Sequence, residues 1–291
     1  DSINCVLIAL IAKKVKLSLF KYAGFLAAFS PLMIVISSQM LSDTLFLSLF
    51  LTFIYLFIDY LKKENIITLV FSALFLGFSI YVRTVSFPLV FGVALTLFII
   101  NIINKKKITY TVLRNFFIFL VFSIAPIFDR LYSNIINYNS FGLTTQKGTH
   151  LVYWVVPAVL DFTNSKNKIK YYEDLKEIKN KSSNEKNPFV KSNELAKFGI
   201  TTLMNSDSKA ILFAWTKGAF INIFAPPFLL DSRIRTLEHP SFYNNNRSIS
   251  EWLRKIVYNK TYDNYKKILI LSLITNLFFV VFFITGLYAF F

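Results

Sequence analysis

Charged side chains stand at the ends of apolar runs in the first third of the chain, where they could do chemistry. Asp43 follows Ser42 at one turn between such runs, and Arg83 lies at a later turn. A carboxylate can bind a metal, a sugar hydroxyl or a cation, and the arginine fork can bind two phosphate oxygens at once. Each residue also has a structural explanation. Ser42 and Asp43 suit a helix start, and Arg83 can extend from a helix end to a membrane interface.

A third polar cluster comes later, in DRLYSNIINYNSFGLTTQKGTHLVYW (129–154), which carries cations and ends in aromatic residues. Cations beside aromatic rings suit a lipid-linked phosphate and a sugar ring, and they also suit an ordinary interfacial belt. The case depends on three turns converging on one face. The candidate substrate-binding residues are Asp43, Arg83, Arg130, Lys147 and His150.

Other catalytic and metal-binding patterns are missing from the sequence. It contains no P-loop, GxSxG, HExxH or GxGxxG motif, so an ATP-driven pump or a soluble-type hydrolase has no support. His150 and His239 are the only histidines and Cys5 is the only cysteine. The sequence therefore predicts neither a His/Cys zinc site nor an internal disulfide, and no residue is assigned as a metal ligand.

The composition is that of a polytopic membrane protein. The chain has 291 residues, of which 55% are hydrophobic and 18% aromatic, and its mean hydropathy is +0.52. A soluble domain of this length rarely reaches such values. The net charge of +16 would suggest nucleic acid in a soluble protein. Here the lysines fall in loops between apolar runs and in one long polar region, so we expect no nucleic-acid partner.

About seven segments meet or approach the roughly 20 apolar residues that a membrane-spanning helix needs. They are 2–12 (partial), 22–38, 44–60, 66–82, 87–104, 108–127 and 267–290. Lysines gather in alternate short loops, around Lys14, Lys62 and Lys106. Because basic short loops stay in the cytoplasm, the Asp43 and Arg83 turns are predicted to be external. Gly77 and Gly92 are predicted to allow close helix packing.

The sequence therefore predicts an all-α fold, a polytopic transmembrane helical bundle of about seven spans, the first partial, with a largely helical external region. Its predicted divisions are a transmembrane core (1–128), an external region (129–265) and a C-terminal transmembrane helix (266–291). Within the external region, helices are predicted at 169–181 and 192–205, the first with an apolar stripe at Ile169, Tyr172, Leu175 and Ile178.

Two further external helices are predicted. Segment 208–228 is apolar but contains Lys209 and Lys217, which favours a helix lying on the membrane, with a spanning helix as the alternative. Ser248 and Glu251 form a capping-box pattern that opens another helix.

The order of three motifs resembles the core of bacterial GT-C glycosyltransferases, over roughly residues 1 to 225. These are membrane enzymes related to protein O-mannosyltransferases and the lipid A aminoarabinose transferase. The motifs are DSINCVLIALIAKKV, AAFSPLMIVISSQMLSDTLF and GFSIYVRTVSFP. Asp43 stands where the family has Glu after Ser, and Thr84 where Pro often follows Arg. NYNSFGLTTQKGTHLVYW resembles the family's later external segment.

The resemblance implies an inverting glycosyltransferase of the cell envelope, with external catalysis in the bacterial inner membrane. The donor would be a polyprenyl-phosphate sugar, and the acceptor a glycan, a lipid or a protein. No cofactor is certain, and the family contains both metal-dependent and metal-independent members. The family's catalytic acid lies in a first external loop, so the general base is expected upstream of Asp1. Both ends of the chain look cut, and we expect this fragment to be inactive alone.

Functions of other classes share this layout. A polytopic transporter or lipid-carrier flippase is the main alternative, and a polysaccharide ligase or a structural membrane protein is a further one. A transporter places ionisable groups at the bilayer midplane within discontinuous helices. Here the apolar runs are nearly free of charge and polar groups gather at their external ends, which favours chemistry on a lipid substrate at the membrane surface.

Overall fold

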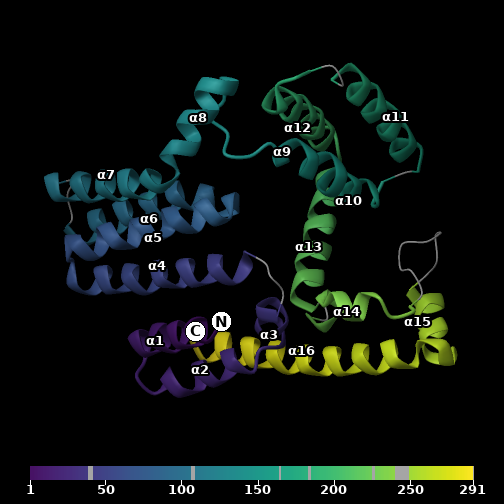
Figure 1. The fold of residues 1–291 in the computed structure, drawn as a ribbon, viewed down its shortest axis with the longest axis horizontal. Helices are drawn as coiled ribbons and strands as arrows, with labels where there is room; N and C mark the ends of the chain where they lie inside the picture. The colour runs from purple at the N-terminus through teal and green to yellow at the C-terminus, as the bar shows by residue number, and fades with distance from the viewer. Residues whose placement is uncertain are drawn as a thin grey trace.

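The computed structural model describes residues 1–38, 42–105, 109–163, 165–182, 185–224, 227–239 and 249–290. Within these ranges every regular element is a helix, as the all-α prediction requires. Figure 1 shows α4 to α7 side by side as one bundle, with α1 and α2 beside it. The helices α9 to α15 lie beyond one end of that bundle, and α8 projects from the bundle near that end.

The helices of the first half are α1 (Ser2–Val15), α2 (Leu19–Ala28), α3 (Pro31–Ser38), α4 (Asp43–Lys63), α5 (Ile66–Val82), α6 (Phe87–Lys105), α7 (Tyr110–Ile124) and α8 (Phe128–Tyr138). Those of the second half are α9 (Gln146–His150), α10 (Val156–Leu160), α11 (Ser165–Lys181), α12 (Pro188–Met204), α13 (Ser208–Phe224), α14 (Ser232–Arg235), α15 (Ile249–Tyr258) and α16 (Asp263–Phe290). A short π-helical stretch, Leu151–Val155, joins α9 to α10.

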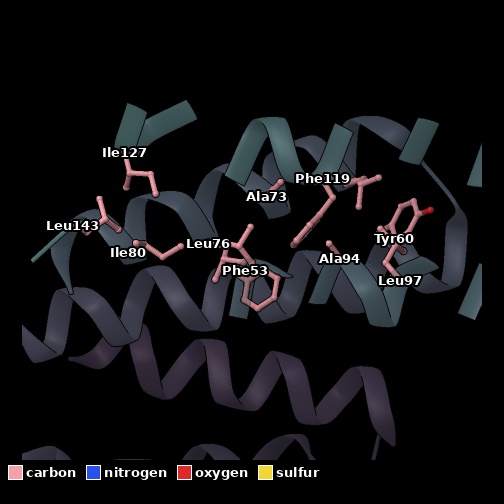
Figure 2. Close-up of a cluster of buried hydrophobic side chains, with 12 residues drawn as sticks. Phe53, Tyr60, Ala73, Leu76, Ile80, Ala94, Leu97, Phe119, Ile127 and Leu143 are labelled. Atoms are coloured by element: carbon pink, nitrogen blue, oxygen red, sulfur yellow. The ribbon is translucent and has the colours of Figure 1, made fainter. Parts of the chain in front are cut away.

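The bundle core is formed by apolar side chains of α4, α5, α6 and α7. Phe53, Leu76, Leu97 and Phe119 are buried together there. Figure 2 shows these side chains, with the Tyr60 ring, pointing into the space between the helices. Because the rest of each helix surface is also apolar, many large side chains stay exposed on the outside of the bundle. A helix that is hydrophobic all round is expected where lipid replaces water.

Gly77 lets α5 approach the end of α7 closely, as predicted. A Cβ atom at Gly77 would lie 2.5 Å from the Ser123 carbonyl oxygen and 2.7 Å from the Pro126 ring. The prediction for Gly92 is wrong, since a Cβ atom there would meet nothing within 4 Å. Gly92 lies on an open face of α6, and the sequence alone does not distinguish an exposed glycine from one at a helix contact.

In the described ranges, four helical stretches are long and apolar enough to cross a membrane. They are Asp43–Lys63, Thr84–Ile103, Tyr110–Tyr138 and Lys260–Phe282. Predicted segment 22–38 is broken into α2 and α3, which meet at a bend of 51° and make a fifth candidate if the pair is one span. The Ile66–Val82 helix is shorter, and α1 has only 14 residues. All seven predicted segments contain helix, but seven full spans are not seen.

The last long helix, α16, is displaced lengthwise relative to the α4 to α7 bundle. In Figure 1 it begins beyond the end of the bundle where α13 to α15 lie, and its C-terminal part reaches α2 and α3. Phe278 and Phe282 of α16 line an apolar groove with Phe25 of α2 and with Phe29, the residue after α2. The α16 axis is therefore roughly aligned with the bundle helices and shifted lengthwise.

The two helices predicted at 169–181 and 192–205 are present as α11 and α12. The apolar stripe predicted on α11 is wrong in part, because Ile169 and Tyr172 are exposed. The buried face instead runs through Tyr171 and Leu175, with Ile178 packed against the same core. This spacing of four and then three residues follows one side of an α-helix more closely than a strict interval of three.

The α13 helix crosses the direction of the bundle at its end (Figure 1). Large apolar side chains are exposed on all its sides, among them Leu212, Trp215 and Phe220. The predicted helix after the capping box is α15, but Ser248 lies outside the described residues.

Candidate functional site

Asp43 and Arg83 meet at one end of the bundle, where their side chains form an ion pair. Asp43 is the first residue of α4, and Arg83 follows the last residue of α5. The two helices form an antiparallel hairpin through Glu64 and Asn65, so the start of one lies beside the end of the other. Ser42 makes no side-chain cap hydrogen bond. Asp43 therefore both begins α4 and pairs with a charged side chain at the end of the neighbouring helix.

A hollow of about 540 Å³ opens beside this ion pair. Three of its lining side chains bear or can bear a positive charge: Arg83, Arg130 and His150. The remaining wall residues are small, polar or aliphatic; they are Ser42, Val82, Thr84, Val85, Thr144 and Gln146. The hollow thus combines groups from the α5 end, from α8 and from α9.

Arg130 and His150 are positioned by different parts of the chain. Arg130 lies on α8, which continues α7 after a short 3-10 turn at Ala125–Ile127. His150 ends α9, whose Gly148 packs tightly on α12 and donates its backbone N–H to Ser192 Oγ at 3.1 Å. Within the described residues, neither side chain has an ion pair. Arg83, by contrast, already has Asp43 as its partner.

Lys147 is the predicted site residue that the structure leaves out of the hollow. It is exposed on α9 and does not line the wall, although its neighbour Gln146 does. On a helix this short, adjacent residues point in directions about 100° apart, so one can face the hollow while the other faces away. The structure therefore brings together Asp43, Arg83, Arg130 and His150.

A small cleft of about 240 Å³ adjoins Asp43 on its other side. Asp1 and Asp43 both line it, among apolar residues of α3 and α4. Asn4 of α1 is fully buried beneath it, donates to Asp1 Oδ1 at 3.2 Å and to the Thr44 carbonyl at 3.3 Å, and accepts from Ser48 Oγ at 2.7 Å. Sequence reasoning missed Asn4, and its only signal was an amide inside an apolar run.

The described residues contain no group of three or more His, Cys, Asp or Glu side chains that could hold a metal ion. The hollow itself is lined by cations and hydroxyl or amide groups. Such a lining suits an anionic ligand with oxygen atoms, because guanidinium groups bind phosphate and carboxylate oxygens.

The opposite end of the bundle carries another polar group of residues. Lys14 Nζ lies 2.5 Å from Asp59 Oδ1, and Lys63 Nζ lies 3.3 Å from the same atom. Close by, the buried Asn115 amide donates to Tyr60 Oη at 2.8 Å. Here each of these charged groups has a partner of opposite charge.

Comparison with known proteins found no match among family models, curated proteins or solved structures. The class of protein is therefore defined by the fold itself. It is an all-helical chain whose apolar helices are long enough to indicate a membrane protein.

Proposed function

We propose that this protein is a membrane glycosyltransferase that transfers a sugar from a polyprenyl-phosphate-linked donor to a glycan, lipid or protein acceptor. The observation that carries the proposal is the hollow at the Asp43 end of the bundle, lined by Arg83, Arg130 and His150. Its cations lie where apolar helices end, so a lipid phosphate could reach them while its isoprenoid chain stays among apolar side chains. The resemblance of the sequence motifs to the GT-C family supports the same proposal.

The proposed reaction is an inverting displacement. The acceptor hydroxyl oxygen attacks the anomeric carbon, the bond from that carbon to the phosphate oxygen breaks, and polyprenyl phosphate leaves, while the hydroxyl proton passes to the departing phosphate or to water. Arg130 and His150, which have no ion-pair partner in the described residues, stabilise the negative charge on the leaving phosphate. Arg83 holds one wall of the site together with Asp43. We assign no general base among the described residues, and a divalent metal is not required by the proposal.

The proposed setting is the bacterial inner membrane. In it the bundle (1–128) and the last helix (266–291) lie in the bilayer, and the region 129–265 is external. The basic short loops around Lys14 and Lys62 face the cytoplasm, and the hollow opens on the external side.

Sugar transfer from a polyprenyl-phosphate sugar by the full-length protein in liposomes, including any residues that precede Asp1, tests the proposal. Release of polyprenyl phosphate is measured for the native protein, Arg83→Ala and Arg83→Lys, each checked for folding by circular dichroism. We expect Arg83→Ala to lose most turnover, because it removes one wall of the site and leaves Asp43 unpaired, and Arg83→Lys to keep part of it. A folded Arg83→Ala variant with native turnover and donor affinity would show that Arg83 forms no wall of the donor site and would contradict the proposal.

Membrane orientation is tested by cysteine labelling in intact cells. In a Cys5→Ala background, a cysteine at Ser42 should react with a membrane-impermeant maleimide, whereas one at Lys63 should react only after the cells are opened. The opposite pattern would place the hollow in the cytoplasm and contradict external catalysis.

A lipid-carrier flippase or transporter is the second candidate function. The break of 51° between α2 and α3 favours it, because transporters build their binding sites from discontinuous helices. The two functions differ in the product. A flippase moves the intact lipid-linked sugar between leaflets, whereas a transferase in the same liposomes breaks the bond between sugar and phosphate.

A further inference from the structure

A second polar hollow, of about 450 Å³, lies between α11 and α12. These helices stand away from the α4 to α7 bundle in Figure 1. Its volume falls within the range of about 300–1,000 Å³ that small-molecule sites occupy. A ligand here would be held by the helices beyond the end of the bundle, outside the apolar helix surfaces.

The base of this cleft is a closed hydrophobic core. Tyr171 and Phe198 stack with ring centroids 5.3 Å apart and an angle of 10° between their planes. Tyr171 Oη donates to the Val152 carbonyl at 2.6 Å, and burial raises the pKa of this phenol, which keeps it protonated as a donor. Leu175 and Leu195 complete the core. The aromatic base is thus fixed in place before any ligand binds.

The walls above this base are polar where helix packing would ordinarily be apolar. On α11, Asn167, Lys170 and Asp174 follow one another at intervals of three and four residues, which places them on one face. Thr201 of α12 and Asn205, which follows the last residue of that helix, line the cleft with them, four residues apart. Two antiparallel helices usually bury an apolar seam along their whole contact. Along the contact between α11 and α12, the apolar side chains of Leu175 and Leu195 give way to amide, hydroxyl, ammonium and carboxylate groups.

The charges in the cleft indicate the kind of ligand. Among the described residues that line the cleft, Lys170 is the one cation, while Asp174 and Asp207 both contribute carboxylates. This balance disfavours an anion such as phosphate, in contrast to the hollow beside Arg83. Amide, hydroxyl and carboxylate groups together supply both donors and acceptors, which a polyhydroxylated ligand requires. An aromatic base adds an apolar surface for the C–H face of a sugar ring.

We propose that the cleft between α11 and α12 binds a neutral saccharide. Asp174 and Asn205 from its two walls bind the sugar hydroxyls, and Tyr171 and Phe198 form the surface below the ring. The role of this saccharide as part of the acceptor depends on the proposed glycosyltransferase function, whereas the binding itself does not.

Calorimetric titration of the purified full chain with free sugars tests the proposal. The probes are glucose, N-acetylglucosamine and glucuronate at millimolar concentrations. We expect both neutral sugars to bind and glucuronate to bind at least about 5-fold more weakly than glucose, because its carboxylate would lie near Asp174 and Asp207. Absence of binding by both neutral sugars, or equal binding of glucuronate, would overturn the proposal.

Two variants that remove a carboxylate from α11 locate the site. Asp174→Ala should weaken glucose binding about 10-fold, since it removes a charged hydrogen-bond acceptor. Glu173→Ala, at the preceding residue of the same helix but outside the cleft wall, should bind glucose as the native protein does. Equal losses in both variants, with helical content unchanged, would show that the cleft is not the binding site.

The same titration separates this proposal from the proposed function. Arg83→Ala should keep native glucose binding even though it loses sugar transfer. Glucose binding without any transfer by the native protein would refute the transferase function and leave the saccharide cleft in place. Transfer by the native protein with no sugar binding at the cleft would refute the cleft alone.

Discussion

The two ends of the α4 to α7 bundle carry similar residue types and use them differently. At the end proposed to face the cytoplasm, called here the inner end, Lys14 and Lys63 both lie within ion-pair distance of Asp59, and Tyr60 accepts a hydrogen bond from Asn115. At the opposite end, called here the outer end, Arg83 is the one ion-pair partner of Asp43 among the described residues. Arg130 and His150 line a hollow beside that pair and have no ion pair in the described residues.

The difference shows which charged residues are explained by folding. A charged side chain whose partner is already present stabilises the helix arrangement. Its charge is largely neutralised by that partner, so it attracts a further ligand only weakly. A cation in a hollow without a partner keeps its full attraction for an anionic ligand. The outer end therefore has the features of a binding site, whereas the inner end has those of a structural clasp between α1 and α4.

Removal of an unpaired cation at the outer end should have the largest effect. Arg130→Ala should lower kcat/KM for sugar transfer about 10–100-fold, because a hydrogen bond to a charged group contributes roughly 1.5–3 kcal/mol. Lys147→Ala is the matched control, since Lys147 is exposed on α9 outside the hollow. The assignment of the hollow fails if Lys147→Ala loses as much activity as Arg130→Ala.

A side chain added at Gly77, where α5 contacts the end of α7, should lower the free energy of unfolding. Gly77→Ala places a methyl group against the Ser123 carbonyl and the Pro126 ring, and overpacking of this kind costs about 1–3 kcal/mol. The free energy of unfolding, measured by SDS titration in mixed micelles, should fall by that amount. Gly92→Ala, where the added atom meets nothing, should stay within about 0.5 kcal/mol of native or gain slightly from helix propensity.

A change at the inner end should affect folding and leave activity alone. Tyr60→Phe removes the acceptor of the Asn115 amide, and a buried group left unsatisfied costs about 1–2 kcal/mol. The same SDS titration measures this loss, and sugar transfer by the folded fraction should stay native. Loss of transfer per folded molecule would mean that the inner end also contributes to function.

The smallest effect is expected for the inner ion pair. Asp59 keeps Lys63 as a partner when Lys14 is removed, and both Lys14 and Asp59 are partly exposed, with 15% and 19% of their side chains accessible, so removal of Lys14 should cost less than about 1 kcal/mol. Lys14→Met should therefore shift the unfolding free energy by that amount or less, and the shift should shrink in high salt. A loss of unfolding free energy above about 3 kcal/mol would show that the Lys14–Asp59 pair contributes far more than a partly exposed ion pair does.

The sequence predicted the helices and the pairing of turns more reliably than the side-chain details. Loop charges alone place Asp43 and Arg83 at the same end, because each apolar run reverses the direction of the chain. The tertiary position of Lys147 could not be predicted, since its side of a five-residue helix depends on how Gly148 packs against Ser192.

Two other features were also beyond sequence reasoning. The buried face of α11 depends on which side meets α10 and α12, so Tyr171 replaced Tyr172 as the core residue. The break between α2 and α3 at Phe29 and Ser30 precedes a proline that could equally start or kink a helix. Only the packing of neighbouring helices decides between such alternatives.

Equilibrium binding of polyprenyl phosphate to the protein in nanodiscs tests the difference between the two ends most directly. One variant joins Arg130→Ala to His150→Ala at the outer end, and the other joins Lys14→Ala to Lys63→Ala at the inner end. We predict that the outer pair raises the Kd about 100-fold and that the inner pair changes it less than about 3-fold. Equal changes from the two pairs, or a larger change from the inner pair, would contradict the account.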